Sequence, residues 1–508
     1  MIAPASAPSA TRRLATVAGG AGVGLFALAI GVAQAPFSYD DAWITYRYAF
    51  NLASGNGLVY NVGERVFGTS APGYAVLLGL LAWPWPDAVP IISAAFCAVA
   101  LAAIALAFFA FGVMRGAPLA GAVAAMLFVV NPLALESFGG EMLTQAALAL
   151  WALVLVSMDR PSLATACAVA ATVVRPDGLI VLLVALAWQT WRRRSVPWRQ
   201  GLVAAAVLGA WFGVLWWYFG TPLPQTLAAK QAQRVSGMWS AFGTDFGLWL
   251  LALTPYDTPF TVPRTHSGFA AFLGLGVSGL LVLPWRREWW ALAAWPVAIC
   301  VVFRQMRLPF YHWYAVPPAV LLAITAGLSC DVVARWLGAV AHRWWPAASP
   351  RRPATAVAAA VIVVMIGVVS VRPLTAIAFD TRAWFPGPGE RAYAAIGNWL
   401  AARTPANASV GYVEIGLVGY HARRRMIDPF GLVTPGAAAA VGRQDLLYSY
   451  RTHRPDFILH SPVYFPAQMG RLEREDWFRH EYVAVATLDS GRGYPLTVWR
   501  RSPPSPAR

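Results

Sequence analysis

Long apolar runs recur along most of this chain, and they limit its possible folds more than any other feature of the sequence. Between Leu14 and Val371 these runs are long enough to form membrane-spanning helices and carry almost no charge. Hydrophobic residues make up 58% of the 508 residues, and charged residues only 12%. A water-soluble protein of this length would not tolerate such runs. The sequence therefore predicts a polytopic α-helical membrane protein.

Arginine positions predict how the chain crosses the membrane. Arg12 and Arg13 precede the first run, which places that end in the cytoplasm. The run 71–85 is short and ends in Trp83-Pro84-Trp85-Pro86, so we expect it to lie in the outer interface. The remaining arginine-rich loops then all fall on the cytoplasmic side. About eleven spans are predicted, in a bacterial cytoplasmic (inner) membrane: 14–34, 89–113, 118–133, 142–158, 163–174, 178–191, 202–219, 269–283, 289–303, 313–328 and 354–371.

Two features that suggest other functions have simpler explanations. The formal net charge is +16, but the arginines cluster in short loops between apolar runs, so we expect no nucleic-acid partner. The segment from Gly19 to Gly24 looks like a glycine-rich phosphate loop. It lies inside a predicted span, where small residues favour close packing of helices.

The composition changes near Leu374, which divides the chain into a transmembrane domain, 1–373, and a tail, 374–508. The tail is polar throughout, with strand-like pieces at 410–413, 457–460 and 483–486 and a helix-like stretch at 390–402. It contains no nucleophile elbow and no metal-ligand spacing. We predict an extracytoplasmic α/β domain that covers or orients a site rather than one that carries out chemistry of its own.

Charged residues gather at the outer ends of the predicted spans, whereas a carrier would place them near the middle of the membrane. They begin with the adjacent Asp40 and Asp41 in the first outer loop, 36–71. A carboxylate can take a proton from a hydroxyl group, and two adjacent carboxylates raise each other's pKa or share a divalent cation. Arginine and lysine can bind a phosphate. Together these groups suit transfer of a group from a lipid-linked phosphate to a hydroxyl acceptor.

The first loop resembles that of the GT-C glycosyltransferases, multi-spanning enzymes that use polyprenyl-phosphate sugars, and most of all that of the actinobacterial terminal arabinofuranosyltransferases. The shared pattern comprises Asp40-Asp41, Ile44, Arg47, Asn51-Leu52, Gly55-Asn56-Gly57, Asn61, Gly63-Glu64-Arg65-Val66 and Thr69. More loosely it includes Arg175-Pro176-Asp177-Gly178 and Leu223-Pro224-Gln225-Thr226. The specific part covers about thirty residues, while the order of spans followed by a soluble tail covers the whole chain.

The resemblance implies an inverting glycosyltransferase whose catalytic base is Asp40 or Asp41, with a possible divalent cation between them. Asp41 is favoured, because its neighbours Ala42 and Trp43 offer less competing polarity. The second carboxylate would be Glu141 or, less favoured, Glu136. Arabinofuranose is the favoured sugar and a cell-envelope glycan the favoured acceptor, with mannosyl or other transfer as alternatives. The predicted substrate-binding residues are Arg47, Glu64, Arg65, Thr69, Arg175, Asp177, Lys230, Arg234 and His312.

Each candidate residue also has a purely structural interpretation. The aspartates could cap a helix or pair with Arg47, and Glu64 could pair with Arg65 or another neighbour. Arg175 and Asp177 could anchor a proline turn, Lys230 and Arg234 could be surface charges, and His312 could belong to an interfacial aromatic belt. For the whole protein, the alternatives from other classes are a flippase or transporter of a lipid-linked sugar and a non-catalytic scaffold.

Overall fold

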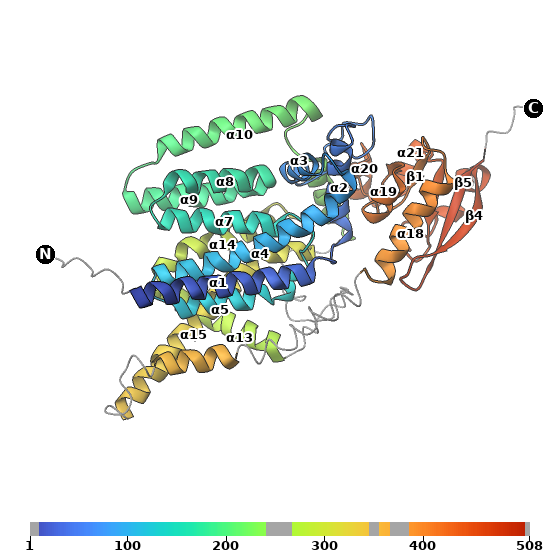
Figure 1. The fold of residues 1–508 in the computed structure, drawn as a ribbon. Helices are drawn as coiled ribbons and strands as arrows, with labels where there is room; N and C mark the ends of the chain where they lie inside the picture. Colours follow the sequence, from blue (N-terminus) through green and yellow to red (C-terminus); the bar gives the residue numbers. More distant parts are fainter. Residues whose placement is uncertain (1–9, 240–266, 345–354, 366–385, 503–508) are drawn as a thin grey trace, which may run out of the picture.

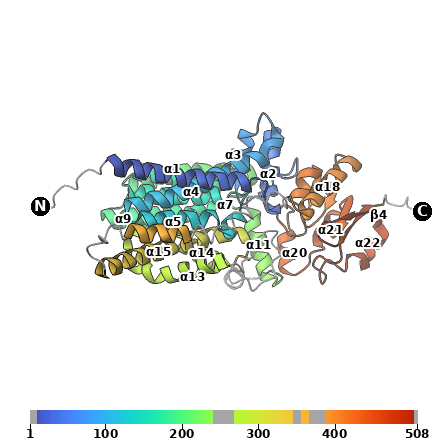
Figure 2. The same cartoon turned by 60° about the horizontal axis from the view of Figure 1, so that its bottom comes forward.

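The computed structural model describes residues 10–239, 267–344, 355–365 and 386–502. Long helices lie side by side in a bundle, and a smaller unit of helices and strands, residues 386–502, sits against one end of it (Figures 1 and 2). Three short helices lie between the two parts: α2 (Asp40–Ala53), α3 (Pro72–Leu81) and α11 (Gln225–Val235). We call residues 386–502 the C-terminal unit.

The bundle helices coincide closely with the apolar runs of the sequence. Their bounds are α1 (Ala10–Gln34), α4 (Val89–Met114), α5 (Pro118–Val129), α6 (Pro132–Leu135), α7 (Met142–Ser157), α8 (Pro161–Val174), α9 (Leu179–Arg193), α10 (Trp198–Phe219), α13 (Ser267–Val282), α14 (Trp290–Gln305), α15 (Val316–Trp344) and a helix Thr355–Met365. Short 3-10 turns join several of them, at Pro86–Ala88, Pro176–Gly178, Leu283–Trp285, Arg287–Trp289 and His312–Ala315.

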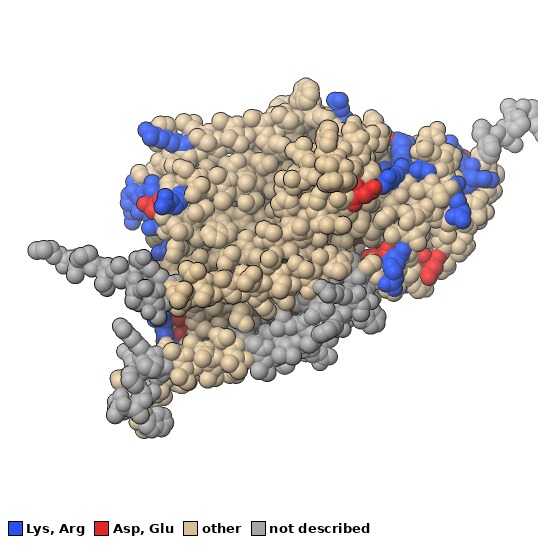
Figure 3. Space-filling view, viewed as in Figure 1, with Lys and Arg blue, Asp and Glu red and all other residues tan. Residues whose placement is uncertain are grey.

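Four helical segments are long and apolar enough to cross a membrane: Leu14–Gln34, Pro86–Met114, Trp198–Phe219 and His312–Trp344. Other apolar helices have 10–17 residues. The side of the bundle seen in Figure 3 is a broad uncharged belt, with charged side chains at its far end and on the C-terminal unit. The protein is thus a multi-pass membrane protein, while the number of about eleven spans stays a prediction.

Close packing of helices explains the glycines of the first span. Gly19, Gly24 and Gly31 all lie within α1, which packs along α4. A Cβ atom added to Gly31 would lie 2.6 Å from the Cα of Ala98, so α4 can approach only because that position has no side chain. Within the segment 19–24, a Cβ atom added to Gly19 would lie 2.9 Å from the Phe109 ring, and one added to Gly24 would lie 3.3 Å from the Leu106 side chain. These contacts with α4 agree with the interpretation of the segment as a packing face.

The C-terminal unit contains a five-stranded mixed sheet in the order β2-β1-β3-β5-β4. β1 runs parallel to β2 and to β3, whereas β5 is antiparallel to both β3 and β4. The strands are β1 (Ser409–Gly411), β2 (Arg425–Ile427), β3 (Phe457–His460), β4 (Tyr482–Asp489) and β5 (Pro495–Arg501). The helices are α18 (Pro388–Arg403), α19 (Leu417–Ala422), α20 (Ala437–Gly442), α21 (Tyr448–His453) and α22 (Asp476–Glu481), with a 3-10 turn at Leu472–Arg474.

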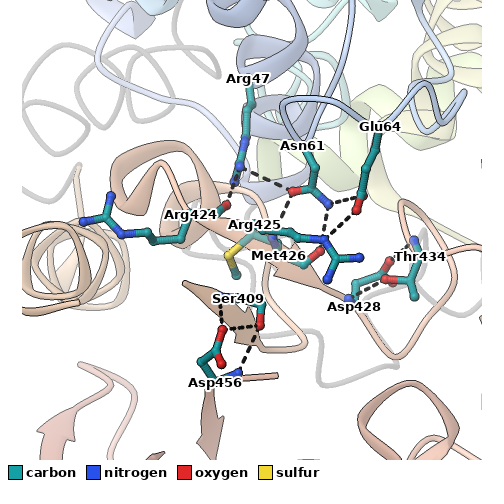
Figure 4. A network of polar contacts seen from close by, with 10 residues as sticks. All are labelled: Arg47, Asn61, Glu64, Ser409, Arg424, Arg425, Met426, Asp428, Thr434 and Asp456. Atoms are coloured by element: carbon teal, nitrogen blue, oxygen red, sulfur yellow. Dashed lines mark hydrogen bonds and ion pairs between the residues drawn. The ribbon is translucent and has the colours of Figure 1, made fainter. Parts of the chain in front are cut away.

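Polar side chains of the first loop hold the C-terminal unit in place. The buried Arg47 guanidinium donates hydrogen bonds to the carbonyls of Tyr60, Gly419 and Arg424. The Asn61 side chain exchanges two hydrogen bonds with the backbone of Met426, at 2.8 and 3.0 Å. Figure 4 shows these side chains of the first loop reaching the segment 424–426. Buried polar groups that satisfy one another in this way fix how the two parts are oriented.

Candidate active site

A small pocket lies where the bundle, the first loop and the C-terminal unit meet. Its volume is about 30 Å³. The lining residues come from α2, the segment 68–70, the start of α7, α11, the turn before α15 and the C-terminal unit: Tyr39, Asp41, Ile44, Thr45, Gly68, Thr69, Ser70, Glu141, Thr226, Lys230, Trp313 and Leu432. Four of the predicted site residues, Asp41, Thr69, Glu141 and Lys230, therefore lie together.

The two adjacent aspartates have different surroundings. Successive residues on a helix point about 100° apart, and only Asp41 faces the pocket. The Asp40 carboxylate accepts hydrogen bonds from the backbone N–H groups of Gly416 and Leu417, at 3.1 and 2.8 Å. Asp40 thus caps the start of α19 in the C-terminal unit, a capping role of the kind that the sequence left open. Neither carboxylate takes part in the hydrogen bonds that Arg47 donates, which go to backbone carbonyls and to Asn61.

Burial shifts the titration of both carboxylates. Loss of solvation raises the pKa of Asp41 to about 6, against the opposing attraction of the Lys230 ammonium. Burial also raises the pKa of Asp40, with a further contribution from Glu414, while the N–H groups of Leu417 and Gly416 act against this rise. Asp41 can therefore exchange a proton near neutral pH, as a general base must.

Lys230 reaches the pocket from α11 through a cage of aromatic rings. Its ammonium nitrogen donates a hydrogen bond of 2.9 Å to the Tyr314 hydroxyl and lies 4.7 Å from the centre of the Tyr311 ring and 5.2 Å from that of Trp313. Cation–π attraction holds the ammonium group in place. The sequence did not reveal this cage, because the rings lie more than eighty residues from Lys230.

Arg234 and His312 lie outside the lining of the pocket. Arg234 is half-buried one helical turn after Lys230. The His312 ring stands edge-on to Tyr39, with 5.3 Å between the ring centres. His312 therefore supports the aromatic wall of the pocket, as a member of an aromatic belt would.

Glu141 is held in the pocket by a charged network behind it. It forms a buried ion pair with Arg175, and Arg175 also pairs with Asp177 at 3.1 Å. Gln145 donates a hydrogen bond to Asp177. Arg175 and Asp177 thus position Glu141 without lining the pocket, and Glu136, the less favoured candidate, is also buried away from it.

The remaining candidates of the first loop serve different contacts. Thr69 hydrogen-bonds Thr45 across 3.1 Å, and both threonines line the pocket. Glu64 pairs with Arg425 of the C-terminal unit rather than with Arg65. The Arg65 guanidinium lies over the Tyr218 ring and borders a second, larger cavity of about 450 Å³.

Metal binding at the aspartate pair receives no support from the arrangement of side chains. Within residues 10–239, 267–344, 355–365 and 386–502, no group of three or more His, Cys, Asp or Glu side chains is placed to hold a metal ion. Asp40 is moreover occupied by two backbone N–H groups. A divalent cation between Asp40 and Asp41 stays a prediction.

A comparison of the sequence with protein families finds a match at the C-terminal unit. A family described as a domain of unknown function (DUF8728) matches residues 382–500. A search of curated proteins gives no match.

Comparisons of the structure find membrane glycosyltransferases. The oligosaccharyltransferase of Archaeoglobus fulgidus, tethered to an acceptor peptide, matches with a TM-score of 0.53 and 13% identity, over 95% of this chain and 74% of that one. AglB of the same organism, in complex with an inhibitory peptide and a dolichol-phosphate, matches with a TM-score of 0.50 and 14% identity, over 87% and 69%. ArnT from Cupriavidus metallidurans has a TM-score of 0.49 and 16% identity, over 97% and 98%. The chain has the GT-C fold, as the resemblance of its first loop implied.

Proposed function

We propose that this protein is a membrane glycosyltransferase that moves a sugar from a polyprenyl phosphate to a hydroxyl acceptor on the extracytoplasmic side. The observation that carries the proposal is the pairing of Asp41 and Lys230 in one pocket at the end of a GT-C fold. A carboxylate whose pKa is about 6 can accept a hydroxyl proton. A buried ammonium group can neutralise a phosphate.

In the proposed reaction, the acceptor oxygen attacks the anomeric carbon of the sugar. The bond from that carbon to the phosphate oxygen breaks, and its electron pair leaves with the polyprenyl phosphate. Asp41 takes the hydroxyl proton, while Lys230 balances the charge that develops on the phosphate. Attack from the face opposite the leaving group inverts the anomeric centre.

Glu141 is the second carboxylate of the proposed site. Positive charge spreads over the sugar ring as the bond to phosphate breaks, and a nearby carboxylate stabilises that charge. The ion pair with Arg175 fixes the Glu141 carboxylate in the pocket. Asp40 is less suited to act as the base than Asp41, because backbone N–H groups already engage its oxygens.

The proposed substrates follow from the resemblance and from a structural relative. A dolichol-phosphate is bound in one structure of the archaeal oligosaccharyltransferase, which supports a polyprenyl-phosphate donor here. The first loop favours arabinofuranose as the sugar and a bacterial cell-envelope glycan as the acceptor, with a mannosyl or other GT-C transferase as the alternative. A flippase of a lipid-linked sugar remains the alternative from another class, and it would leave the bond between sugar and phosphate intact.

Mass spectrometry of cell-envelope glycans, with and without this protein, tests the proposal in its own membrane. We expect one glycan to lose a specific sugar residue when the protein is absent. Supplying the Asp41→Asn variant should not restore that sugar, whereas supplying the wild-type protein should restore it. Identical glycans in all four samples would contradict the proposal, and restoration by Asp41→Asn would favour the flippase.

The rate of transfer should fall in acid, because Asp41 must be ionised to accept a proton. Its pKa of about 6 places the acid limb of kcat/KM near pH 6 in the wild type. Lys230→Met removes the ammonium group that holds the pKa of Asp41 down. The acid limb of its residual kcat/KM should therefore lie about 1 pH unit or more above that of the wild type. Lys230→Arg keeps the charge and should keep the limb near 6. Equal limbs in Lys230→Met and the wild type would refute this electrostatic coupling.

A further inference from the structure

The parallel strands of the C-terminal unit end at its boundary with the first loop. Val413 and Glu414 follow shortly after β1, and Tyr464 comes four residues after β3. In the order β2-β1-β3, the chain passes from β1 to β2 on one side of it and then crosses to β3 on the other side. Open α/β sheets commonly bind ligands beyond the carboxyl ends of two such neighbouring strands.

The segment that follows β1 adjoins the candidate active site. The carbonyl of Ile415 accepts a hydrogen bond of 2.5 Å from the Tyr60 hydroxyl, and Gly416 and Leu417 bind Asp40. Glu414 therefore stands immediately before a segment that rests on the first turn of α2. Its carboxylate is close enough to contribute to the raised pKa of both Asp40 and Asp41. The C-terminal unit thus brings a carboxylate into the neighbourhood of the proposed base.

Four tyrosines lie close enough to the Glu414 carboxylate for its charge to raise the pKa of each: Tyr393, Tyr412, Tyr464 and Tyr494. The Tyr464 hydroxyl donates a hydrogen bond to Oε1 of Glu414. The ring centres of Tyr464 and Tyr494 lie 6.5 Å apart, and those of Tyr393 and Tyr412 lie 6.2 Å apart. In the described part of the chain, Tyr464 is the one residue shown to hydrogen-bond this carboxylate, which leaves Oε2 for a ligand. Carboxylate oxygens accept hydrogen bonds from hydroxyl groups, and aromatic rings offer apolar faces for contact.

We propose that Glu414 and Tyr464 form a carbohydrate subsite that holds the acceptor, with its reactive hydroxyl directed toward Asp41. The subsite rests on the proposed function, which it deepens by assigning the residues that hold the sugar acceptor. Oε2 of Glu414 accepts a hydrogen bond from a hydroxyl group of the acceptor sugar, and Tyr464 fixes the carboxylate through Oε1. The C-terminal unit is then a substrate-binding part of the enzyme and more than a cover.

Steady-state kinetics of the full-length protein in detergent tests the subsite. The acceptors are synthetic arabinofuranose and mannose oligosaccharides of several lengths. Glu414→Gln should raise the acceptor KM about tenfold or more, because a hydrogen bond to a charged group is lost. The donor KM should stay within twofold of the wild type, as should kcat at saturating acceptor. Tyr464→Phe, which keeps the ring, should raise the acceptor KM about threefold.

Glu481→Gln is the matched control, because Glu481 ends α22, just before the edge strand β4, and pairs with Arg454. Its kinetics should equal those of the wild type. An unchanged acceptor KM in Glu414→Gln and Tyr464→Phe would overturn the subsite. So would a rise in donor KM equal to the rise in acceptor KM.

A binding measurement separates failure of the subsite from failure of the proposed function. Saturation-transfer NMR can follow the same oligosaccharides on the Asp41→Asn protein, which should bind them and lose the signal when Glu414→Gln is added. If Glu414→Gln transfers sugar as the wild type does, the proposed function holds and the subsite is refuted. Glu414-dependent binding in a protein that transfers no sugar would leave a sugar-binding site without the function. If Glu414→Gln loses binding because it unfolds, the acceptor KM of Tyr464→Phe decides whether the subsite exists.

Discussion

Replacing Asp41 with asparagine is expected to lower kcat for sugar transfer by about 10²–10⁴, the usual contribution of a positioned general base. The amide has the size of the carboxylate but cannot take the acceptor proton. Its neighbour Lys230 keeps its hydrogen bond to Tyr314, so binding of the donor should change little. The rate is measured with purified protein, a polyprenyl-phosphate sugar and a saturating acceptor.

Asp40→Asn is the matched control for this prediction. The asparagine side chain retains one oxygen that can accept a hydrogen bond from Gly416 or Leu417. We therefore expect it to keep most of kcat and to weaken the contact with α19 instead. Full activity of Asp41→Asn, or an equal loss in both variants, would contradict the assignment of Asp41 as the base.

Arg47→Met is expected to destabilise the attachment of the C-terminal unit by roughly 2–4 kcal/mol, because buried carbonyls lose a charged donor. The Gly419 and Arg424 carbonyls belong to the C-terminal unit and the Tyr60 carbonyl to the first loop. The variant should show a lower unfolding temperature in detergent. It should also be cut earlier by protease between the bundle and residue 386.

Arg65→Met is the matched control for Arg47→Met. Arg65 is exposed, and its recorded contact is with the Tyr218 ring, an interaction that contributes about 0.5–1 kcal/mol at exposed sites. Its unfolding temperature should lie close to that of the wild type. Equal stability of Arg47→Met and Arg65→Met would show that the Arg47 hydrogen bonds do not hold the two parts together.

Local patterns were enough to predict most of the helices. The predicted run 142–158 became α7 (Met142–Ser157), because a long uncharged apolar segment has few alternatives in a membrane. The run 313–328 was too short, since α15 continues to Trp344. Beyond residue 328 the helix contains Asp331, whose carboxylate pairs with Arg286 and Arg335, and these ion pairs allow a buried charge within the helix.

The candidate site could be predicted only in part, because its other half comes from distant segments. The first loop drew attention to Asp41 and Thr69, which line the pocket. In the same loop, Asp40 and Glu64 contact the C-terminal unit, more than 350 residues away. Glu414 and Leu432 were missed for the same reason, since no local spacing relates them to the first loop. Such contacts depend on how the first loop and the C-terminal unit pack together, which local sequence patterns do not encode.

Reconstituted sugar transfer tests the central claim most directly. The purified protein is incubated with polyprenyl-phosphate arabinofuranose or mannose and an oligosaccharide acceptor, and mass spectrometry follows both products. We predict one free polyprenyl phosphate for each sugar added to the acceptor, with inverted anomeric configuration, and almost no release with Asp41→Asn. Intact donor after incubation with the wild type, or equal release by Asp41→Asn, would contradict the account.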